Sequence, residues 1–181
     1  MLGQKTDDEL IAKALEGSER AWNRLVQRYE KRVYNYALRM VSHQDDAMDL
    51  MQDVFMSVYR NLGSFRGDAP FAAWLFRIAA FRCTDHFRKR RFQQEEYEDM
   101  EDAESDPLLN VESARHNGDI VRLLHRLSQE QRQVVELKFF QNFTFEEIGG
   151  QLGISTNTAK TRLYAALKKL RTSADLSAIA C

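Results

Sequence analysis

The sequence predicts an all-α protein made of two small helical domains that are joined by an acidic linker. Apolar residues recur every three or four positions along most of the chain, as they do on one face of an amphipathic helix. The 181 residues include only two prolines and eight glycines, which are few for a sheet with many turns. A composition of 44% hydrophobic and 29% charged residues is typical of a folded protein.

The first domain is predicted over residues 1–92, and it starts with two helices. Thr6 and Glu9 have the spacing of a capping box, so a short helix should begin there and end near Gly17. A long amphipathic helix should follow from Glu19. Its apolar stripe consists of Trp22, Leu25, Val26, Tyr29, Val33, Tyr36, Ala37, Met40 and Val41.

Two further helices complete this domain. The third should stop at Gly63, and the fourth should contain Pro70 in its first turn, where a helix tolerates proline. The fourth then runs into the basic cluster at 88–91. The apolar stripe of the third helix is Ala47, Leu50, Met51, Val54, Phe55, Val58, Tyr59 and Leu62, and that of the fourth is Phe71, Trp74, Leu75, Ile78, Ala79 and Phe81.

Residues 93–118 have the composition of a flexible, solvated linker, because eight acids fall within a short stretch that has little apolar surface to bury. We therefore expect the domain boundary there. The acids are Glu95, Glu96, Glu98, Asp99, Glu101, Asp102, Glu104 and Asp106.

The second domain is predicted over residues 119–176. After one helix around residues 120–127, Ser128 should cap a second, and Thr144 with Glu147 should cap a short third that reaches Gly153. The last helix should bury Ala159, Leu163, Ala166, Leu167 and Leu170.

Helix, turn and helix over residues 144–171 have the layout of a helix-turn-helix, which places its second helix in the major groove of DNA. Lysine, arginine, asparagine and threonine on the outer face of that helix suit base edges and phosphates. The alternative is a plain helical hairpin with a solvated polar face. Gly149 is explained if the two helices of the motif cross closely there, whereas Gly150 has no evident role.

The fourth helix alternates aromatic and cationic side chains. Aromatic rings stack on unpaired bases while cations follow the phosphates, so the pattern favours binding of single-stranded nucleic acid. Any one of these aromatics could instead belong to the core. The aromatic and cationic residues of this pattern are Phe71, Trp74, Phe76, Arg77, Phe81, Arg82, His86, Phe87 and Arg88.

No cofactor or metal site is predicted. Cys83 and Cys181 lie far apart, without further cysteines or histidines at ligand spacing, so two reduced thiols are expected. The first residues lack the apolar segment of a signal peptide and no window is apolar enough to span a membrane, so we expect a cytoplasmic protein. The four histidines have unrelated contexts and no phosphate-binding glycine loop is present, so an enzyme is not expected.

Four segments carry a resemblance to a known family. Residues 46–55 (DAMDLMQDVF), 64–67 (SFRG) and 74–79 (WLFRIA) closely resemble region 2 of the extracytoplasmic-function (ECF) sigma factors of bacterial RNA polymerase. Residues 146–171 resemble their region 4. The resemblance covers the chain from about Trp22 to Arg171, with the motifs in the family's order and spacing.

The resemblance implies a transcription initiation factor that binds core RNA polymerase and promoter DNA. It assigns binding of the clamp of the largest polymerase subunit to Asp46, Asp49, Gln52, Asp53 and Phe55. It assigns recognition and melting of the minus-10 element to Phe65, Arg66, Trp74, Arg77, Phe81, Arg82 and Arg88. It assigns recognition of the duplex minus-35 element to Asn157, Thr158, Lys160, Thr161, Arg162 and Tyr164. An anti-sigma factor, often anchored in the membrane, is also expected as a partner, and no small-molecule substrate is.

Departures from the family pattern leave the promoter sequence open. Phe81 replaces a common asparagine, Ala165 a common arginine, and residues 157–159 read Asn-Thr-Ala instead of Gly-Thr-Val. The main alternative function is a helix-turn-helix regulator that binds duplex DNA without polymerase.

Overall fold

The computed structural model describes residues 6–96 and 113–179, and every element in these two ranges is helical. α1 (Asp7–Leu15) begins at the predicted capping box, in which Thr6 and Glu9 bond each other's backbone N–H groups. A turn at Gly17, with a φ of 91°, leads into α2 (Glu19–Val41). Both helices therefore begin where the sequence predicts.

α3 (Gln44–Asn61) packs along α2 and ends in a 3-10 turn, η1 (Leu62–Ser64). α4 (Phe71–Glu96) crosses both. Pro70 lies just before α4 and not inside its first turn, and its carbonyl accepts a hydrogen bond from the Ala73 N–H. The proline thus caps the helix. Because it lies before the first turn, its missing N–H removes no hydrogen-bond donor from the helix.

The second group consists of α5 (Ser113–His125), α6 (Gln129–Val135), a π-helical turn η2 (Glu136–Phe140), α7 (Phe145–Leu152) and α8 (Thr156–Ile179). Ser128 with Gln131 and Thr144 with Glu147 form the predicted capping boxes. Both ends of the expected linker are helical, because α4 continues to Glu96 and α5 begins at Ser113. The acids from Glu98 to Asp106 lie outside the described residues.

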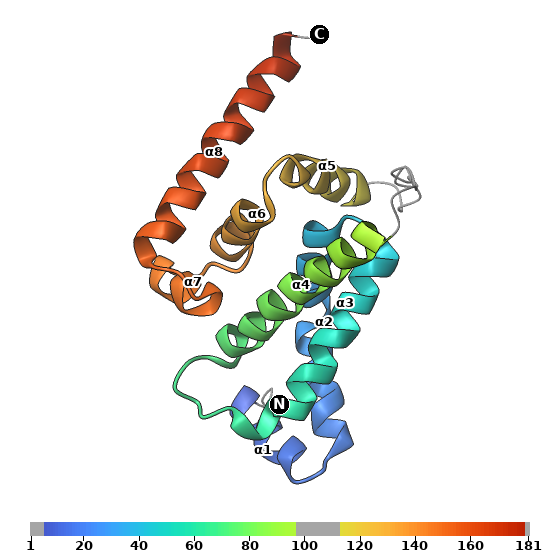
Figure 1. The fold of residues 1–181 in the computed structure, drawn as a ribbon. Coiled ribbons are helices and arrows are strands. Elements are labelled where there is room, and N and C mark those ends of the chain that lie inside the picture. The colour runs from blue at the N-terminus through green and yellow to red at the C-terminus, as the bar shows by residue number, and fades with distance from the viewer. Residues whose placement is uncertain (1–5, 97–112, 180–181) are drawn as a thin grey trace.

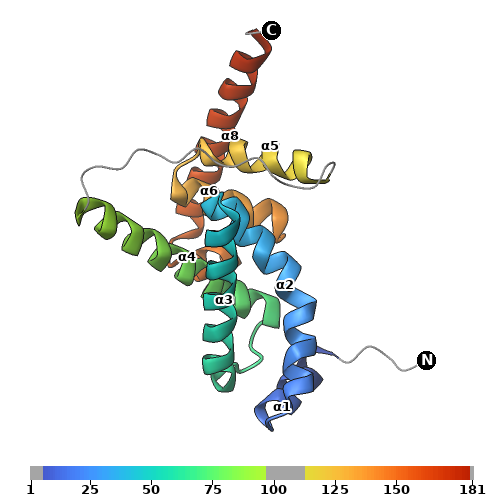
Figure 2. The ribbon, with the colours of Figure 1, turned by 90° about the vertical axis from the view of Figure 1, so that its right-hand side faces the viewer.

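The two groups of helices pack against each other around one continuous set of buried side chains. α5 and α6 contact α2, and α7 contacts α4. In Figures 1 and 2 the yellow and orange helices lie against the blue and green ones, while the end of α8 projects away from the rest. This contact between the two units was not predicted from the sequence.

Three residues expected in apolar stripes are exposed. The side chain of Tyr59 is 59% exposed, that of Phe81 is 65% exposed, and Leu167 is also exposed. Each lies at the margin of the apolar stripe of its helix. Within the two described ranges, no helix combines the length and apolar character that a membrane span requires.

Candidate functional site

One surface of α3 is acidic. Asp49, Gln52 and Asp53 are exposed at spacings of three and four residues, so they share a face opposite the buried Leu50 and Val54. Asp46 is half-buried and forms an ion pair with Arg90 of α4, with 3.2 Å between Nη1 and Oδ2. The predicted acidic residues thus lie together, with Asp46 at their edge.

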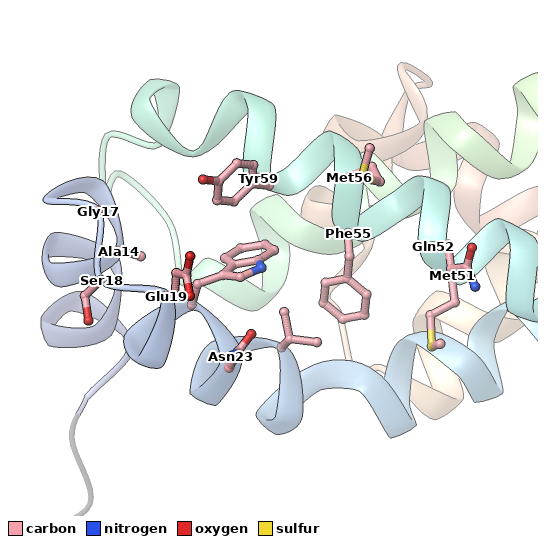
Figure 3. A pocket seen from close by; sticks show the side chains of 12 residues that line it. Ala14, Gly17, Ser18, Glu19, Asn23, Met51, Gln52, Phe55, Met56 and Tyr59 are labelled. Carbon is pink, nitrogen blue, oxygen red and sulfur yellow. The ribbon is translucent and has the colours of Figure 1, made fainter.

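An apolar groove of about 630 Å³ runs beside this acidic surface, between α1, α2 and α3 (Figure 3). Phe55, the fifth predicted polymerase-binding residue, is half-buried and lines the groove together with Met56 and Tyr59. The Tyr59 ring meets the Trp22 ring edge to face, with 5.0 Å between centroids. We call the acidic residues and this groove together the docking face.

Apart from Phe55, sequence reasoning missed the apolar half of the docking face. Met48 and Met56 are exposed on α3 among the acids, and Tyr59 was expected to be buried. Methionine tolerates varied contacts because its side chain is flexible and polarizable. The available signal was the presence of two methionines on the acidic side of the α3 pattern.

The predicted minus-10 residues of α4 fall largely on one stripe. Trp74, Arg77, Phe81 and Arg88 recur at helical spacing, and the last three of them are exposed. Arg88 forms an ion pair with Asp85 on the same helix. An exposed aromatic ring flanked by cations can stack on a base while the cations contact phosphate.

The remaining predicted minus-10 residues have other positions. Phe65 and Trp74 are half-buried and pack on each other with 5.4 Å between ring centroids, and both also contact Phe71. These two rings therefore shape the loop before α4, and Arg66 in that loop is exposed. Arg82 is half-buried beside the stripe, with its Cζ 5.8 Å from the Phe81 ring centroid.

α7 and α8 form the predicted helix-turn-helix. Gly153 ends α7 with a φ of 66°, a conformation that favours glycine. A Cβ on Gly149 would lie 2.8 Å from the carbonyl oxygen of Ile154 in the turn, whereas one on Gly150 would meet nothing within 4 Å. Gly149 therefore lies at a close approach, but the approach is to the turn that leads into α8 and not to a crossing helix as predicted.

The predicted minus-35 residues divide between two faces of α8. Asn157, Lys160, Thr161 and Tyr164 are exposed, and the spacing of these residues puts them on one side. Thr158 and Arg162 are half-buried on the flank. The Thr158 N–H donates to Ser155 Oγ, which caps the helix, and the Lys160 ammonium lies 5.7 Å from the Phe145 ring centroid.

A buried polar cluster lies between the two groups of helices, and sequence reasoning missed it entirely. Arg39 of α2 donates two hydrogen bonds to the Glu136 carboxylate of η2, at 2.6 and 2.7 Å. Burial raises the pKa of Glu136, while the hydrogen bonds from Arg39 oppose that rise. The only sequence signal was a single charge inside each of two short apolar runs, 37–41 and 134–137.

Cys83 is a buried free thiol, whereas Cys181 lies outside the described residues. Burial raises the pKa of the Cys83 thiol to about 12. The reactive thiolate is therefore scarce at neutral pH.

Family comparisons agree with this geometry. The sigma-70 region 2 family matches residues 25–93, which include α3 and the α4 stripe. The sigma-70 region 4 family matches residues 117–170, which include the helix-turn-helix. Together the two matches cover more than half of the chain.

Several proteins are similar along nearly the whole chain. RNA polymerase sigma-H factor of Pseudomonas aeruginosa is 30% identical, and the match covers 92% of each chain. ECF RNA polymerase sigma factor SigM of Mycobacterium tuberculosis is 31% identical over 92% of this chain and 84% of that protein. Among solved structures, CnrH in complex with the cytosolic domain of CnrY is 27% identical with a TM-score of 0.70, covering 94% of this chain and 97% of that one.

The two family matches, the relatives and the arrangement of an acidic docking face, an aromatic-cationic helix and a helix-turn-helix agree with one another. The chain belongs to the ECF sigma factors, which are not enzymes and which direct transcription initiation by RNA polymerase.

Proposed function

We propose that the docking face binds the clamp of core RNA polymerase, while α4 and α8 read the promoter. The observation that carries this assignment is the pairing of exposed acids, Asp49 and Asp53, with an apolar groove that Phe55 lines. Apolar contacts in such a surface would supply affinity, and the acids would orient a basic partner. The function would be performed in the cytoplasm, where polymerase and DNA are found.

We propose further that the exposed stripe of α4 binds the unpaired bases of the minus-10 element. Phe81 is the strongest candidate for stacking because its ring is exposed and lies near two cations, Arg77 and Arg82. Phe65 and Trp74 would support this site by holding the preceding loop in place. Residues 1–92 and 119–176 would act as two DNA-reading units, with 93–118 as the connection.

For the minus-35 element, we propose that Lys160 contacts base edges and Arg162 holds a phosphate at the flank. Lys160 lies with Asn157 on the exposed face, whereas Arg162 is half-buried beside it. Lys160→Ala should cost roughly 1–3 kcal/mol and relax preference at one position, and Arg162→Ala should weaken all sequences alike. Binding of both variant holoenzymes to minus-35 variants across salt concentrations tests this; a changed base preference in Arg162→Ala alone would reverse the roles.

An anti-sigma factor is the proposed inhibitor, and it would cover the docking face. CnrH, which this chain resembles, is bound by the cytosolic domain of CnrY, the kind of arrangement expected of a membrane-anchored inhibitor. The exposed groove beside α3 offers such a partner an apolar surface of suitable size.

The polymerase assignment is tested by run-off transcription and core-polymerase pull-down with Asp49→Lys/Asp53→Lys. We expect loss of holoenzyme formation with unchanged helicity, because both charges are exposed and no buried contact is removed. Asp8→Lys/Glu30→Lys is the matched control, since it changes the same total charge on exposed residues outside the docking face. Normal polymerase binding by the first variant would refute the assignment of polymerase binding to the docking face. Promoter-specific DNA binding without polymerase would support the alternative function of a stand-alone regulator.

A further inference from the structure

Tyr29 is buried on α2, and its hydroxyl is anchored to the first residue of α1. The hydroxyl donates a hydrogen bond to the carboxylate of Asp7, which also forms an ion pair with Arg28. The Asp7 side chain is 25% exposed, so its carboxylate keeps contact with water. Burial, and next the hydrogen bond to Asp7, raise the pKa of Tyr29, so the hydroxyl keeps its proton and remains a donor at neutral pH.

The Tyr29 ring lies against the aromatic residues that surround the loop before α4. It meets the Phe71 ring edge to face, with 5.4 Å between centroids. Phe71 in turn contacts Phe65 at 5.5 Å and Trp74 at 5.7 Å between centroids. We call Phe65, Phe71 and Trp74 the aromatic cluster. Because Phe65 precedes the loop 66–70 and the other two follow it, the cluster joins both ends of the loop.

α1 also contacts the start of this loop directly. It packs against η1, where a Cβ on Gly63 would lie 3.9 Å from Leu15 Cδ2. In Figure 1, α1 lies at the same end of the molecule as the loop between η1 and α4. The family match for region 2 begins at residue 25, so α1 lies before it. A helix outside the family match thus supports a segment that contains predicted minus-10 residues.

The position of the loop depends on the residues at its ends. Residues 66–70 are all exposed, so their own side chains bury little surface that could hold the loop in one conformation. The Tyr29 ring beneath the cluster is held at two points, at its Cβ and at its hydroxyl. A hydrogen bond to a carboxylate is stronger than one between neutral groups. The ring of a phenylalanine, held only at its Cβ, would be freer to tilt.

We propose that Tyr29, anchored by Asp7, is a positioning residue for promoter opening. The pair holds the aromatic cluster, and thereby keeps the loop in the conformation that binds the unpaired minus-10 strand. A loop that is ordered before DNA binds loses less conformational entropy on binding, which increases affinity. This inference rests on the proposed function, because Phe65, Arg66 and Trp74 are among the residues assigned to the minus-10 element. Neither Tyr29 nor Asp7 lines the groove of the docking face.

The first test is amide hydrogen exchange of the free sigma factor carrying Tyr29→Phe, which removes the hydroxyl and keeps the ring. Exchange at residues 66–69 should become at least about fivefold faster than in the unmutated chain, because local opening of the loop becomes easier. Tyr34→Phe is the matched control, since it removes a hydroxyl from a half-buried tyrosine of α2 that is not part of these contacts. It should leave exchange in the loop unchanged.

The second test asks whether Asp7 acts through the Tyr29 hydroxyl. Asp7→Asn keeps an oxygen that can accept the hydrogen bond, whereas Asp7→Ala does not, and both remove the ion pair with Arg28. Asp7→Ala should therefore accelerate exchange in the loop as much as Tyr29→Phe, and Asp7→Asn should restore most of the protection. Asp7→Ala with Tyr29→Phe should be no faster than either alone, because both remove the same hydrogen bond.

The third test measures DNA binding by the holoenzymes. The probe is the single-stranded minus-10 segment of a promoter that the unmutated holoenzyme transcribes. The affinity of Tyr29→Phe for this probe should fall at least about fivefold, because ordering the loop then costs part of the binding free energy. Its affinities for core polymerase and for duplex minus-35 DNA should stay unchanged. A merely structural role, through loss of folded protein, would lower all three affinities.

The positioning role is refuted if Tyr29→Phe leaves exchange in the loop unchanged, or if faster exchange leaves the affinity for the single-stranded probe unchanged. It is also refuted if all three affinities fall together, or if Asp7→Asn accelerates exchange as much as Asp7→Ala. The Asp7 variants decide the question if Tyr29→Phe fails to fold. An unmutated holoenzyme that transcribes but does not bind the single-stranded probe would instead refute the proposed reading of the minus-10 element.

Discussion

Two adjacent glycines, Gly149 and Gly150, have opposite surroundings and give a matched pair of substitutions. Gly149→Ala must displace the turn, since its Cβ would lie 2.8 Å from the Ile154 carbonyl oxygen, and we expect a loss of about 1–3 kcal/mol. Gly150→Ala places a methyl group in open space inside α7 and should gain about 0.5–1 kcal/mol. Urea unfolding of both variants checks the contrast; equal effects would contradict the close approach at Gly149.

His125 should make the stability of the protein dependent on pH. Burial, and the positive charge of Arg132 beside it, lower the pKa of His125 from 6.5 to about 4. One Arg132 nitrogen lies 3.1 Å from His125 Nε2, so the ring accepts this hydrogen bond only while that nitrogen is unprotonated.

Because the unfolded chain binds more protons between these two pKa values, stability is complete above about pH 6.5 and falls as the pH approaches 4. Between pH 7.5 and 5.5 the half-buried ring should account for about 1 kcal/mol of this loss. Urea unfolding of the unmutated chain and of His125→Gln at both pH values measures the difference. An identical loss in the two proteins would show that His125 is not responsible.

The capping boxes of α1 and α7 offer a comparison between helices of different function. Thr144→Ala and Thr6→Ala should each lower stability by about 1 kcal/mol, because each removes a hydrogen bond to a free N–H of the first turn. Only Thr144→Ala should also weaken minus-35 binding, since α7 supports α8 in the helix-turn-helix. Thermal unfolding and minus-35 binding of the holoenzymes test this, and equal loss of binding in both variants would point to a general effect.

A feature of a helix could be predicted where the residues that determine it lie close together in the sequence. The capping boxes at Thr6, Ser128 and Thr144 were readable because each involves residues three positions apart. Tyr59 and Phe81 were misplaced because burial at the margin of a stripe depends on where the neighbouring helix ends. Periodicity alone contains no information on that point.

The candidate site was predictable to a similar degree. The acidic residues of the docking face and the exposed residues of α8 follow from helical spacing together with the family resemblance. The groove and the Arg39–Glu136 pair do not, because each requires residues from helices distant in sequence to meet. A single charge in an apolar run says that a partner is needed, but not which one.

For the chain as a whole, a net charge of −1 combines a strongly acidic segment with the basic residues of α4 and α8. The eight acids between Glu95 and Asp106 should repel DNA phosphates when the sigma factor is free, so their neutralisation should raise promoter affinity of the isolated protein at low salt. The effect should fade as salt rises, since the screening length is about 10 Å at 0.1 M. Promoter binding titrated across salt concentrations tests this, and unchanged affinity throughout would make the segment a simple connection.

The distance along the chain between Arg39 and Glu136 also matters during synthesis. A ribosome adds about 5–20 residues per second, so Arg39 emerges about 5–20 s before the residue that neutralises it. During that interval the N-terminal helices cannot be covered by the C-terminal ones. The form of the protein that any partner meets first on the ribosome therefore lacks the contact between the two units, which can form only after translation has passed η2.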